Sequence, residues 1–176
     1  MLNHYHYRFG QFIALNLPLK FVYGFAVFLA DLRYLFVFRD RRFVRANLQI
    51  ILPHKSIKEL RKISRMVFRN FAKYLVDFFR FEKLDLEYIN KNVKLENMHN
   101  FDQALAKGKG VIVLTAHLGN WELGGVVIAQ LGYPFWVVAL PHKNKKFNDF
   151  FDAQRNRKGV KVIAMGKAVR SCISEI

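Results

Sequence analysis

The stretch of sequence that decides the fold is GKGVIVLTAHLGNWE, residues 108–122. Gly108 and Gly110 lead into a continuous apolar run, Val111–Leu114, which is typical of a strand buried in a parallel sheet. The pair Gly119-Asn120 predicts a tight turn, and the apolar segment Trp121–Leu131 predicts a helix directly after it. The stretch therefore predicts a strand, a turn and a helix in succession.

The same alternation continues on both sides of this stretch. Further short apolar runs predict strands at Val93–Leu95, Phe135–Leu140 and Val160–Ala164. Amphipathic segments predict helices at Phe101–Lys107, at Phe147–Lys158 and from Lys167 onward. Strands that alternate with helices indicate an α/β fold with a mostly parallel sheet and flanking helices. Sites in such sheets lie just beyond the carboxyl ends of the strands, and His117 follows the run Val111–Thr115.

The segment before this region is helical, aromatic and basic. Its clearest element is a helix predicted over Ile57–Phe79, whose start carries the capping-box pair Ser56 and Glu59. One face of this helix forms a basic stripe of five residues, Lys58, Lys62, Arg65, Arg69 and Lys73. Such a stripe is either an ordinary solvated face or a surface for an anionic partner, and the sequence leaves both interpretations open.

The first forty residues are strongly apolar but interrupted by charges. Lys20, Asp31 and Arg33 divide them into runs shorter than the roughly 18–20 residues that span a bilayer. We therefore expect an interfacial membrane anchor over 1–40, with a buried helix of the same domain as the alternative. The chain is then one domain in three parts: this anchor, a basic helical region over 41–90, and an α/β portion over 91–176 that holds the candidate site.

The charge and composition limit the classes of partner. With 29 Lys and Arg against 13 Asp and Glu, the chain has a formal net charge of +16. This excess of positive charge indicates an anionic partner, which is a nucleic acid, a negatively charged membrane or an acidic protein. Because 52% of the residues are hydrophobic and 18 are Phe, the composition argues against disorder and favours a lipid interface. The single cysteine, Cys172, excludes an intramolecular disulfide and a Cys-rich zinc site.

His117 and Glu122 form a candidate acid–base pair across the predicted turn. A neutral imidazole can take the proton from a hydroxyl as its oxygen attacks an activated acyl group, while a carboxylate orients the ring and stabilises the imidazolium. The spacing by itself is unspecific, because His54 and Glu59 repeat it. We assign that second pair to structure, since Glu59 is already the acid of the capping box. The first pair lies between strand, turn and helix signals.

Residues 108–122, and above all the string His-Leu-Gly-Asn-Trp-Glu over 117–122, resemble the active-site block of the lipid A biosynthesis (late) acyltransferase family. This family lies within the lysophospholipid and glycerol-3-phosphate acyltransferase group, which shares an His-x4-acid motif. Arg45–Leu48, Val93–Leu105 and Arg155–Gly159 are also similar to the family. The likeness therefore covers most of the chain.

The resemblance implies transfer of a fatty acyl chain from acyl carrier protein to a hydroxyl of a lipid A precursor or similar glycolipid, at the cytoplasmic face of the inner membrane. It implies that His117 is the general base and Glu122 its orienting acid, without a metal or other cofactor. Arg155, or alternatively Arg157, would contact the thioester oxyanion or a substrate phosphate, and Asn120 would also bind substrate. The expected partners are acyl carrier protein, anionic membrane lipids and the lipid acceptor, with no nucleic acid.

The motif leaves the acceptor and the donor open. A phosphatidylinositol mannoside, a lysophospholipid or an ornithine-type lipid suits the same chemistry, and coenzyme A is the alternative carrier of the acyl group. A non-catalytic basic protein that binds a membrane or a nucleic acid is the alternative from another class. The sequence stops in a predicted helix without the later Gly-rich segment of the family, so we expect an amino-terminal part of such an acyltransferase.

Overall fold

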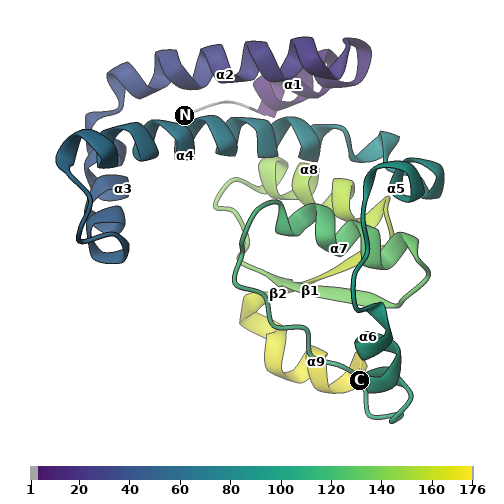
Figure 1. The fold of residues 1–176 in the computed structure, drawn as a ribbon. Helices are drawn as coiled ribbons and strands as arrows, with labels where there is room; N and C mark the ends of the chain where they lie inside the picture. The colour runs from purple at the N-terminus through teal and green to yellow at the C-terminus, as the bar shows by residue number, and fades with distance from the viewer. Residues whose placement is uncertain (1–3, 176) are drawn as a thin grey trace. The chain divides into compact units, whose positions relative to one another are not determined.

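The computed structural model describes residues 4–175 and divides into two compact units, residues 1–80 and 81–176 (Figure 1). Residues 1–3, which belong to the predicted anchor, and Ile176 lie outside the described part. The division falls within the predicted basic region 41–90, directly after its long helix. Each unit has its own packing and is described by itself.

The first unit consists of helices throughout its described length: α1 (His4–Asn16), α2 (Leu19–Phe36), α3 (Phe38–Ile51) and α4 (Ile57–Phe79). Helix α4 has the predicted bounds, and its capping box is confirmed. The Ser56 hydroxyl accepts the Glu59 N–H at 3.3 Å, and the Glu59 carboxylate accepts the Ser56 N–H at 2.9 Å. Glu59 also binds Lys55 at 2.9 Å. Its role is therefore structural, in agreement with the assignment of the His54–Glu59 pair to structure.

Small residues let α1, α2 and α4 approach closely. Ala14, Val22 and Val76 are buried together at the centre of this packing. A side chain at Gly10 would place its Cβ 3.0 Å from the Phe79 ring, so any larger residue there would require the ring to shift. Tyr23 on α2 donates a hydrogen bond to the Asp77 carboxylate on α4. The core of this unit is therefore a narrow seam between helices.

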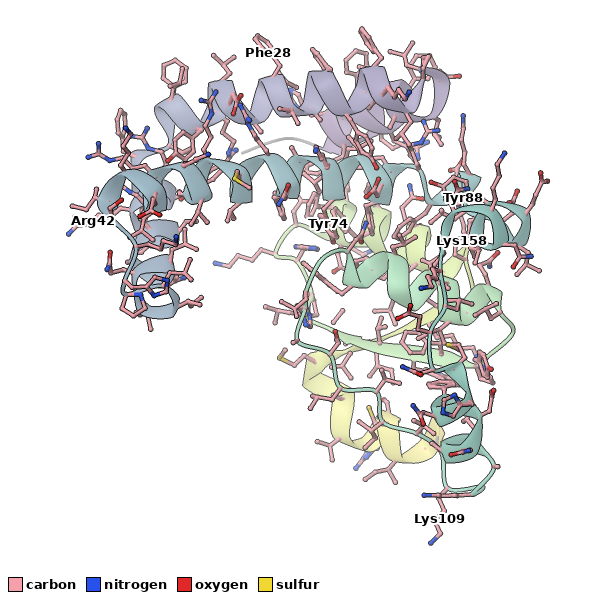
Figure 2. The ribbon with its side chains drawn as sticks, in the orientation of Figure 1. Phe28, Arg42, Tyr74, Tyr88, Lys109 and Lys158 are labelled. Carbon is pink, nitrogen blue, oxygen red and sulfur yellow. The ribbon has the colours of Figure 1, made fainter. Side chains whose placement is uncertain are left out.

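Most large apolar side chains of α2 lie outside this seam. Phe28 points away from α4, as Figure 2 shows. Seven large apolar residues of the helix are at least 42% exposed: Phe21, Phe25, Phe28, Leu29, Leu32, Leu35 and Phe36. No single described helix is long and apolar enough to cross a bilayer, although α2 and α3, joined by a 96° bend, reach the length and composition together. One face of helix α2 is thus apolar and is not covered by the other helices of its unit.

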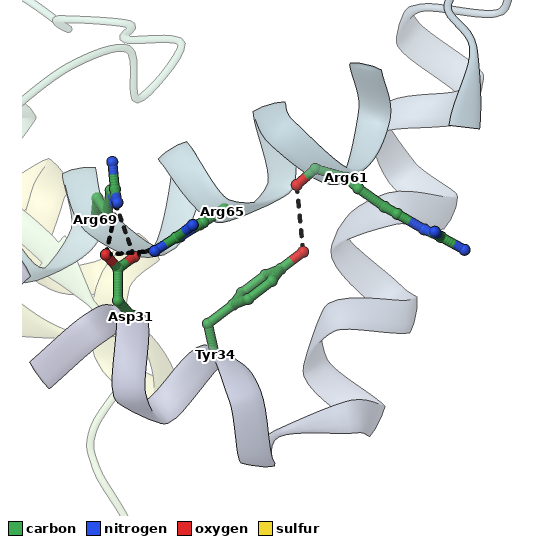
Figure 3. A network of polar contacts seen from close by, with 5 residues as sticks. All are labelled: Asp31, Tyr34, Arg61, Arg65 and Arg69. Atoms are coloured by element: carbon green, nitrogen blue, oxygen red, sulfur yellow. Dashed lines mark hydrogen bonds and ion pairs between the residues drawn. The ribbon is translucent and has the colours of Figure 1, made fainter. Parts of the chain in front are cut away.

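Part of the basic stripe on α4 is used within the unit. The guanidinium groups of Arg65 and Arg69 both bind the Asp31 carboxylate of α2, through four hydrogen bonds of 2.6–2.8 Å (Figure 3). These hydrogen bonds hold the pKa of the Asp31 carboxyl well below its usual range. Tyr34 adds a hydrogen bond from its hydroxyl to the Arg61 carbonyl at 3.3 Å. Two of the five stripe residues therefore clamp α2 to α4.

The second unit contains the strands and the shorter helices of the chain. Its helices are α5 (Leu86–Asn92), α6 (Met98–Leu105), α7 (Trp121–Gln130), α8 (Lys145–Asn156) and α9 (Ala168–Glu175). Its strands are β1 (Phe135–Ala139) and β2 (Val160–Ala164), with 3-10 turns at Phe81–Lys83 and Met165–Lys167. The strands are parallel, in a register that pairs Phe135 with Val160, and α8 connects them. Figure 1 shows α7 and α8 on one side of this strand pair and α9 on the other.

The α/β class is confirmed, but two predicted strands are wrong. Residues 93–97 and 110–118 have no regular secondary structure. In the described part of the chain the sheet contains β1 and β2 alone, and a parallel strand exists only where a neighbour accepts and donates its backbone hydrogen bonds. Ile112 and Leu114 are accordingly 86% and 96% exposed instead of buried. The loop over 110–118 therefore leads from α6 to α7 without joining the sheet.

Candidate active site

His117 lies at the end of this loop, four residues before α7 begins. Its backbone has φ of +53°, in the left-handed region that side chains other than glycine adopt at a cost. Its N–H donates to the Thr115 hydroxyl at 3.3 Å, and its ring packs against the Trp121 ring with centroids 4.8 Å apart. The side chain is exposed. The imidazole is thus accessible to an incoming molecule and rests on the first residue of α7.

The turn between His117 and α7 forms as the sequence predicts. Gly119 has φ of +65°, a conformation that glycine adopts without strain. The Asn120 side chain accepts the Leu123 N–H at 3.1 Å and caps the helix. Asn120 therefore has a structural role in the described contacts, and its predicted contact with substrate stays a prediction.

Glu122 lies in the first turn of α7, where a negative charge is favoured by the helix dipole. Its carboxylate is bound by Arg155 of α8 through two hydrogen bonds: Nε donates to Oε2 at 2.9 Å, and a terminal nitrogen donates to Oε1. The Glu122 and Arg155 side chains are only 14% and 11% exposed. A bidentate pair of this kind is both stronger and more directional than a single contact. It joins the start of α7 to α8.

Arg155 has a second acidic partner that the sequence interpretation missed. Its other terminal nitrogen lies 3.3 Å from Oδ1 of Asp152, one turn earlier on α8. The spacing of three residues on one helix was the available signal, because residues i and i+3 lie on the same face. The cluster of Glu122, Asp152 and Arg155 carries two negative charges and one positive charge. The Arg155 side chain is buried, whereas the two carboxylates are 14% and 27% exposed.

Arg157, the alternative to Arg155 in the prediction, is placed elsewhere. Its guanidinium donates to the Glu82 carboxylate at 2.7 Å, and its side chain is 54% exposed. The neighbouring Lys158 donates to the carbonyls of Glu82 and Leu84 at 3.1 and 2.7 Å. This end of α8 therefore holds the segment after residue 80, which is a structural contact.

The structure brings Glu122 and Arg155 into direct contact and leaves His117 close to the start of the same helix. Among the described contacts no hydrogen bond joins His117 to Glu122, since the ring lies against Trp121. Each Glu122 oxygen retains a further acceptor position beside its hydrogen bond from Arg155. The described residues contain no group of three or more His, Cys, Asp or Glu that could hold a metal ion.

The loop that carries His117 also exposes aliphatic side chains. Leu118 is 83% exposed, and Ile112 and Leu114 of the same segment are exposed as well. An accessible imidazole on a loop with exposed aliphatic side chains, followed in the sequence by a carboxylate–guanidinium pair, suits a reaction on an apolar substrate.

Comparison with known proteins identifies the family of the chain. The sequence profile of bacterial lipid A biosynthesis acyltransferases matches residues 3–176. The chain belongs to this family. It is 20% identical to a lipid A biosynthesis acyltransferase of Haemophilus influenzae over 78% of its own length and 43% of that protein. It is 28% identical to the lipid A biosynthesis palmitoleoyltransferase of Escherichia coli over 62% of its length and 36% of that protein.

A third relative has another acceptor in its name. The chain is 24% identical to a phosphatidylinositol mannoside acyltransferase of Mycolicibacterium smegmatis, over 69% of its length and 40% of that protein. The chain thus spans about two fifths of the length of these curated lipid acyltransferases. No solved structure gives a significant match to it.

Proposed function

We propose that this protein transfers a fatty acyl chain from the thioester of acyl carrier protein to a hydroxyl of a lipid A precursor or similar glycolipid. The observation that carries the proposal is His117, an exposed imidazole at the entrance to α7, in a chain of the lipid A acyltransferase family. The aliphatic side chains on the same loop suit an acyl chain. The excess of Lys and Arg suits two acidic partners, the carrier protein and a phosphorylated lipid.

In the proposed reaction His117 accepts the proton of the acceptor hydroxyl while its oxygen attacks the thioester carbonyl. A new ester bond forms and the carbon–sulfur bond breaks. The imidazolium then returns its proton to the departing thiolate, so that the enzyme ends unchanged. Glu122 accepts the N–H on the other side of the ring once the ring turns from Trp121, and it stabilises the imidazolium. This mechanism uses no covalent enzyme intermediate and no metal.

A phosphatidylinositol mannoside is the second candidate acceptor. The match to the mannoside acyltransferase favours it, because the identity of 24% is similar to the identities of 20% and 28% with the lipid A enzymes. A lysophospholipid acceptor and a coenzyme A donor complete the set to be tested. Assays that offer each acceptor with each donor, in the same detergent, identify the pair with the highest kcat/KM.

The test of the mechanism compares two histidines of the chain. We expect His117→Ala to lower kcat/KM by about 10²- to 10⁴-fold, the usual contribution of a general base. His54→Ala is the matched control, because His54 lies in the exposed turn before α4 and shares the same spacing to an acid. An activity of His117→Ala close to that of His54→Ala contradicts the proposed base. Loss of activity in both variants points to an effect on folding, which circular dichroism identifies.

We also propose that the protein works at the cytoplasmic face of the inner membrane, as a peripheral or monotopic protein. The uncovered apolar face of α2 supports this location, together with the fifteen Lys and Arg and four Asp and Glu of residues 1–80. Aromatic side chains beside basic residues suit an anionic lipid surface. A second copy of so basic a unit would be repelled. The proposal therefore assigns this face to lipid.

Co-sedimentation with vesicles of phosphatidylglycerol and phosphatidylethanolamine tests the location. We expect Phe25→Glu combined with Phe28→Glu to reduce the bound fraction at least tenfold, because two charges enter the apolar face. Leu86→Glu on α5 is the control, since Leu86 is 49% exposed in the other unit. Equal binding of all three proteins assigns the attachment to some other surface.

A further inference from the structure

The Arg155 guanidinium is occupied on both of its edges. Its Nε and one terminal nitrogen donate to Glu122, and the other terminal nitrogen donates to Asp152 at 3.3 Å. The side chain is 11% exposed, whereas the exposed fraction of Arg157 on the same helix end is 54%. A substrate phosphate or thioester oxygen would have to displace a carboxylate from a buried ion pair. Removing one partner of such a pair costs several kcal/mol, because a charge is left buried without compensation.

We infer that Arg155 is a positioning residue that acts through Glu122: held by Asp152, it fixes the Glu122 carboxylate at the start of α7 beside His117. This inference rests on the proposed function, in which His117 is the base. It replaces the expected contact of Arg155 with the substrate by a contact within the protein. The order of the groups is Asp152, Arg155, Glu122 and then His117.

The position of Glu122 matters because it has two possible tasks. Its oxygens already accept two hydrogen bonds from Arg155, yet each has room for one more donor. Trp121, the residue immediately before it, is the residue on which the His117 ring rests. Without Arg155 the Glu122 side chain is free to turn to solvent. The carboxylate would then no longer have a fixed position from which to accept a hydrogen bond from the His117 ring.

Arg155 also sets the charge next to His117. The charged groups that the described contacts bring to this end of α7 are Glu122 on α7 and Asp152 and Arg155 on α8. Their sum is −1 with Arg155 present and −2 without it. A more negative surrounding favours the imidazolium, so we expect removal of Arg155 to favour the protonated form of the His117 side chain. Removal of the Glu122 charge has the opposite sign, because the sum of the remaining charges, Asp152 and Arg155, is then zero instead of −1.

Trp121 offers a direct measurement of this coupling without any substrate. A protonated imidazole quenches indole emission more than a neutral one, and the two rings are 4.8 Å apart. The chain has two tryptophans, and Trp136→Phe leaves Trp121 as the single fluorophore. The midpoint of its emission as a function of pH then reports the protonation of His117. His117→Gln in the same background must abolish the transition.

We expect Arg155→Met to raise this midpoint by about half a pH unit or more, and Glu122→Gln to lower it. Arg157→Met is the matched control and leaves the midpoint in place, since its partner is Glu82. Adding Arg155→Met to Glu122→Gln must give a smaller shift than Arg155→Met alone, because the acting carboxylate is absent. A midpoint that Arg155→Met leaves unchanged, or equal shifts with and without Glu122, overturns the inference.

Two further arms keep the test decisive. If Arg155→Met does not fold, Glu122→Gln and Arg155→Lys remain. Glu122→Gln must lower the midpoint. Arg155→Lys keeps the positive charge, so its midpoint must lie closer to that of the parent protein than the midpoint of any neutral substitution of Arg155 that folds. An unchanged midpoint in Glu122→Gln overturns the inference by itself. Because no acyl transfer is measured, a failure of the proposed reaction, seen as full activity of His117→Ala, is distinguished from a failure of the coupling.

Discussion

The two units use arginine and carboxylate groups in opposite proportions. In residues 1–80 one carboxylate, Asp31, binds two arginines, and the cluster keeps a net positive charge at a partly open helix seam. In residues 81–176 one arginine, Arg155, binds two carboxylates, and the cluster keeps a net negative charge in a nearly closed setting. The Arg65 side chain is 51% exposed, and the Arg155 side chain is 11% exposed.

This difference shows that the basic residues of the chain have two distinct roles, which the sequence alone does not distinguish. A cluster with surplus positive charge near solvent holds helices together and still attracts anions. A buried arginine with surplus carboxylate around it holds a functional acid in place. The strong positive charge of the chain is therefore not simply a surface for partners, because at least three of its arginines, Arg65, Arg69 and Arg155, are bound within their own units.

The largest effect is expected where the cluster is buried. Arg155→Met leaves two carboxylates facing each other and should lower the free energy of unfolding of this unit by about 3 kcal/mol. Urea unfolding followed by tryptophan emission measures this unit, since Trp121 and Trp136 both lie in it. Arg157→Met, from the exposed pair with Glu82, should cost less than about 1 kcal/mol. Equal costs for the two variants would remove the distinction between the clusters.

A smaller and pH-dependent effect is expected from Asp31→Asn. The pKa of the Asp31 carboxyl lies below its usual range in the folded protein, so its contribution to stability is present above about pH 4 and lost as the pH falls further. Near neutral pH the variant should be less stable by roughly 1–2 kcal/mol, because two bidentate arginines lose their partner. In acid the two proteins should converge. Thermal unfolding by far-ultraviolet circular dichroism at several pH values measures the difference.

Asp40→Asn serves as the control for this pH dependence. Asp40 pairs with Arg33 at 3.5 Å through side chains that are 49% and 60% exposed. Such a pair contributes little to stability, so the control should follow the wild type at every pH. If Asp31→Asn also follows the wild type, the ion pairs of Asp31 with Arg65 and Arg69 do not contribute to the stability of the protein.

Elements with their own local signals could be predicted from the sequence almost to the residue. Helix α4 begins at its capping box, and β2 has its predicted bounds. Gly132 and Gly159, which follow the predicted helices Trp121–Leu131 and Phe147–Lys158, have φ of +93° and +82°, which explains why the chain turns there. These signals lie within a few residues of the feature they determine, so one sequence contains them in full.

Features that depend on distant partners could not be predicted. Val111–Leu114 has the composition of a buried strand, but a strand also requires a neighbour, and composition does not say whether one is present. The site shows the same limit. His117, its turn and Glu122 could be located, whereas the bond from Glu122 to Arg155 joins residues 33 positions apart. Only the Asp152–Arg155 spacing within α8 offered a local signal for that cluster.

The smallest effect tests whether the clamp of the first unit is independent of the start of its helix. Ser56→Ala removes the side chain that accepts the Glu59 N–H and should cost about 0.5–1 kcal/mol, while Ser56→Thr, whose hydroxyl can form the same capping box, should cost almost nothing. The cap and Asp31 contact different turns of α4, so the costs of Ser56→Ala and Asp31→Asn should add in the double variant. A double variant less stable than this sum would mean that the first turn of α4 helps to present Arg65 to Asp31. The clamp would then be a property of the whole helix, unlike the cluster around Arg155, which depends on contacts between α7 and α8.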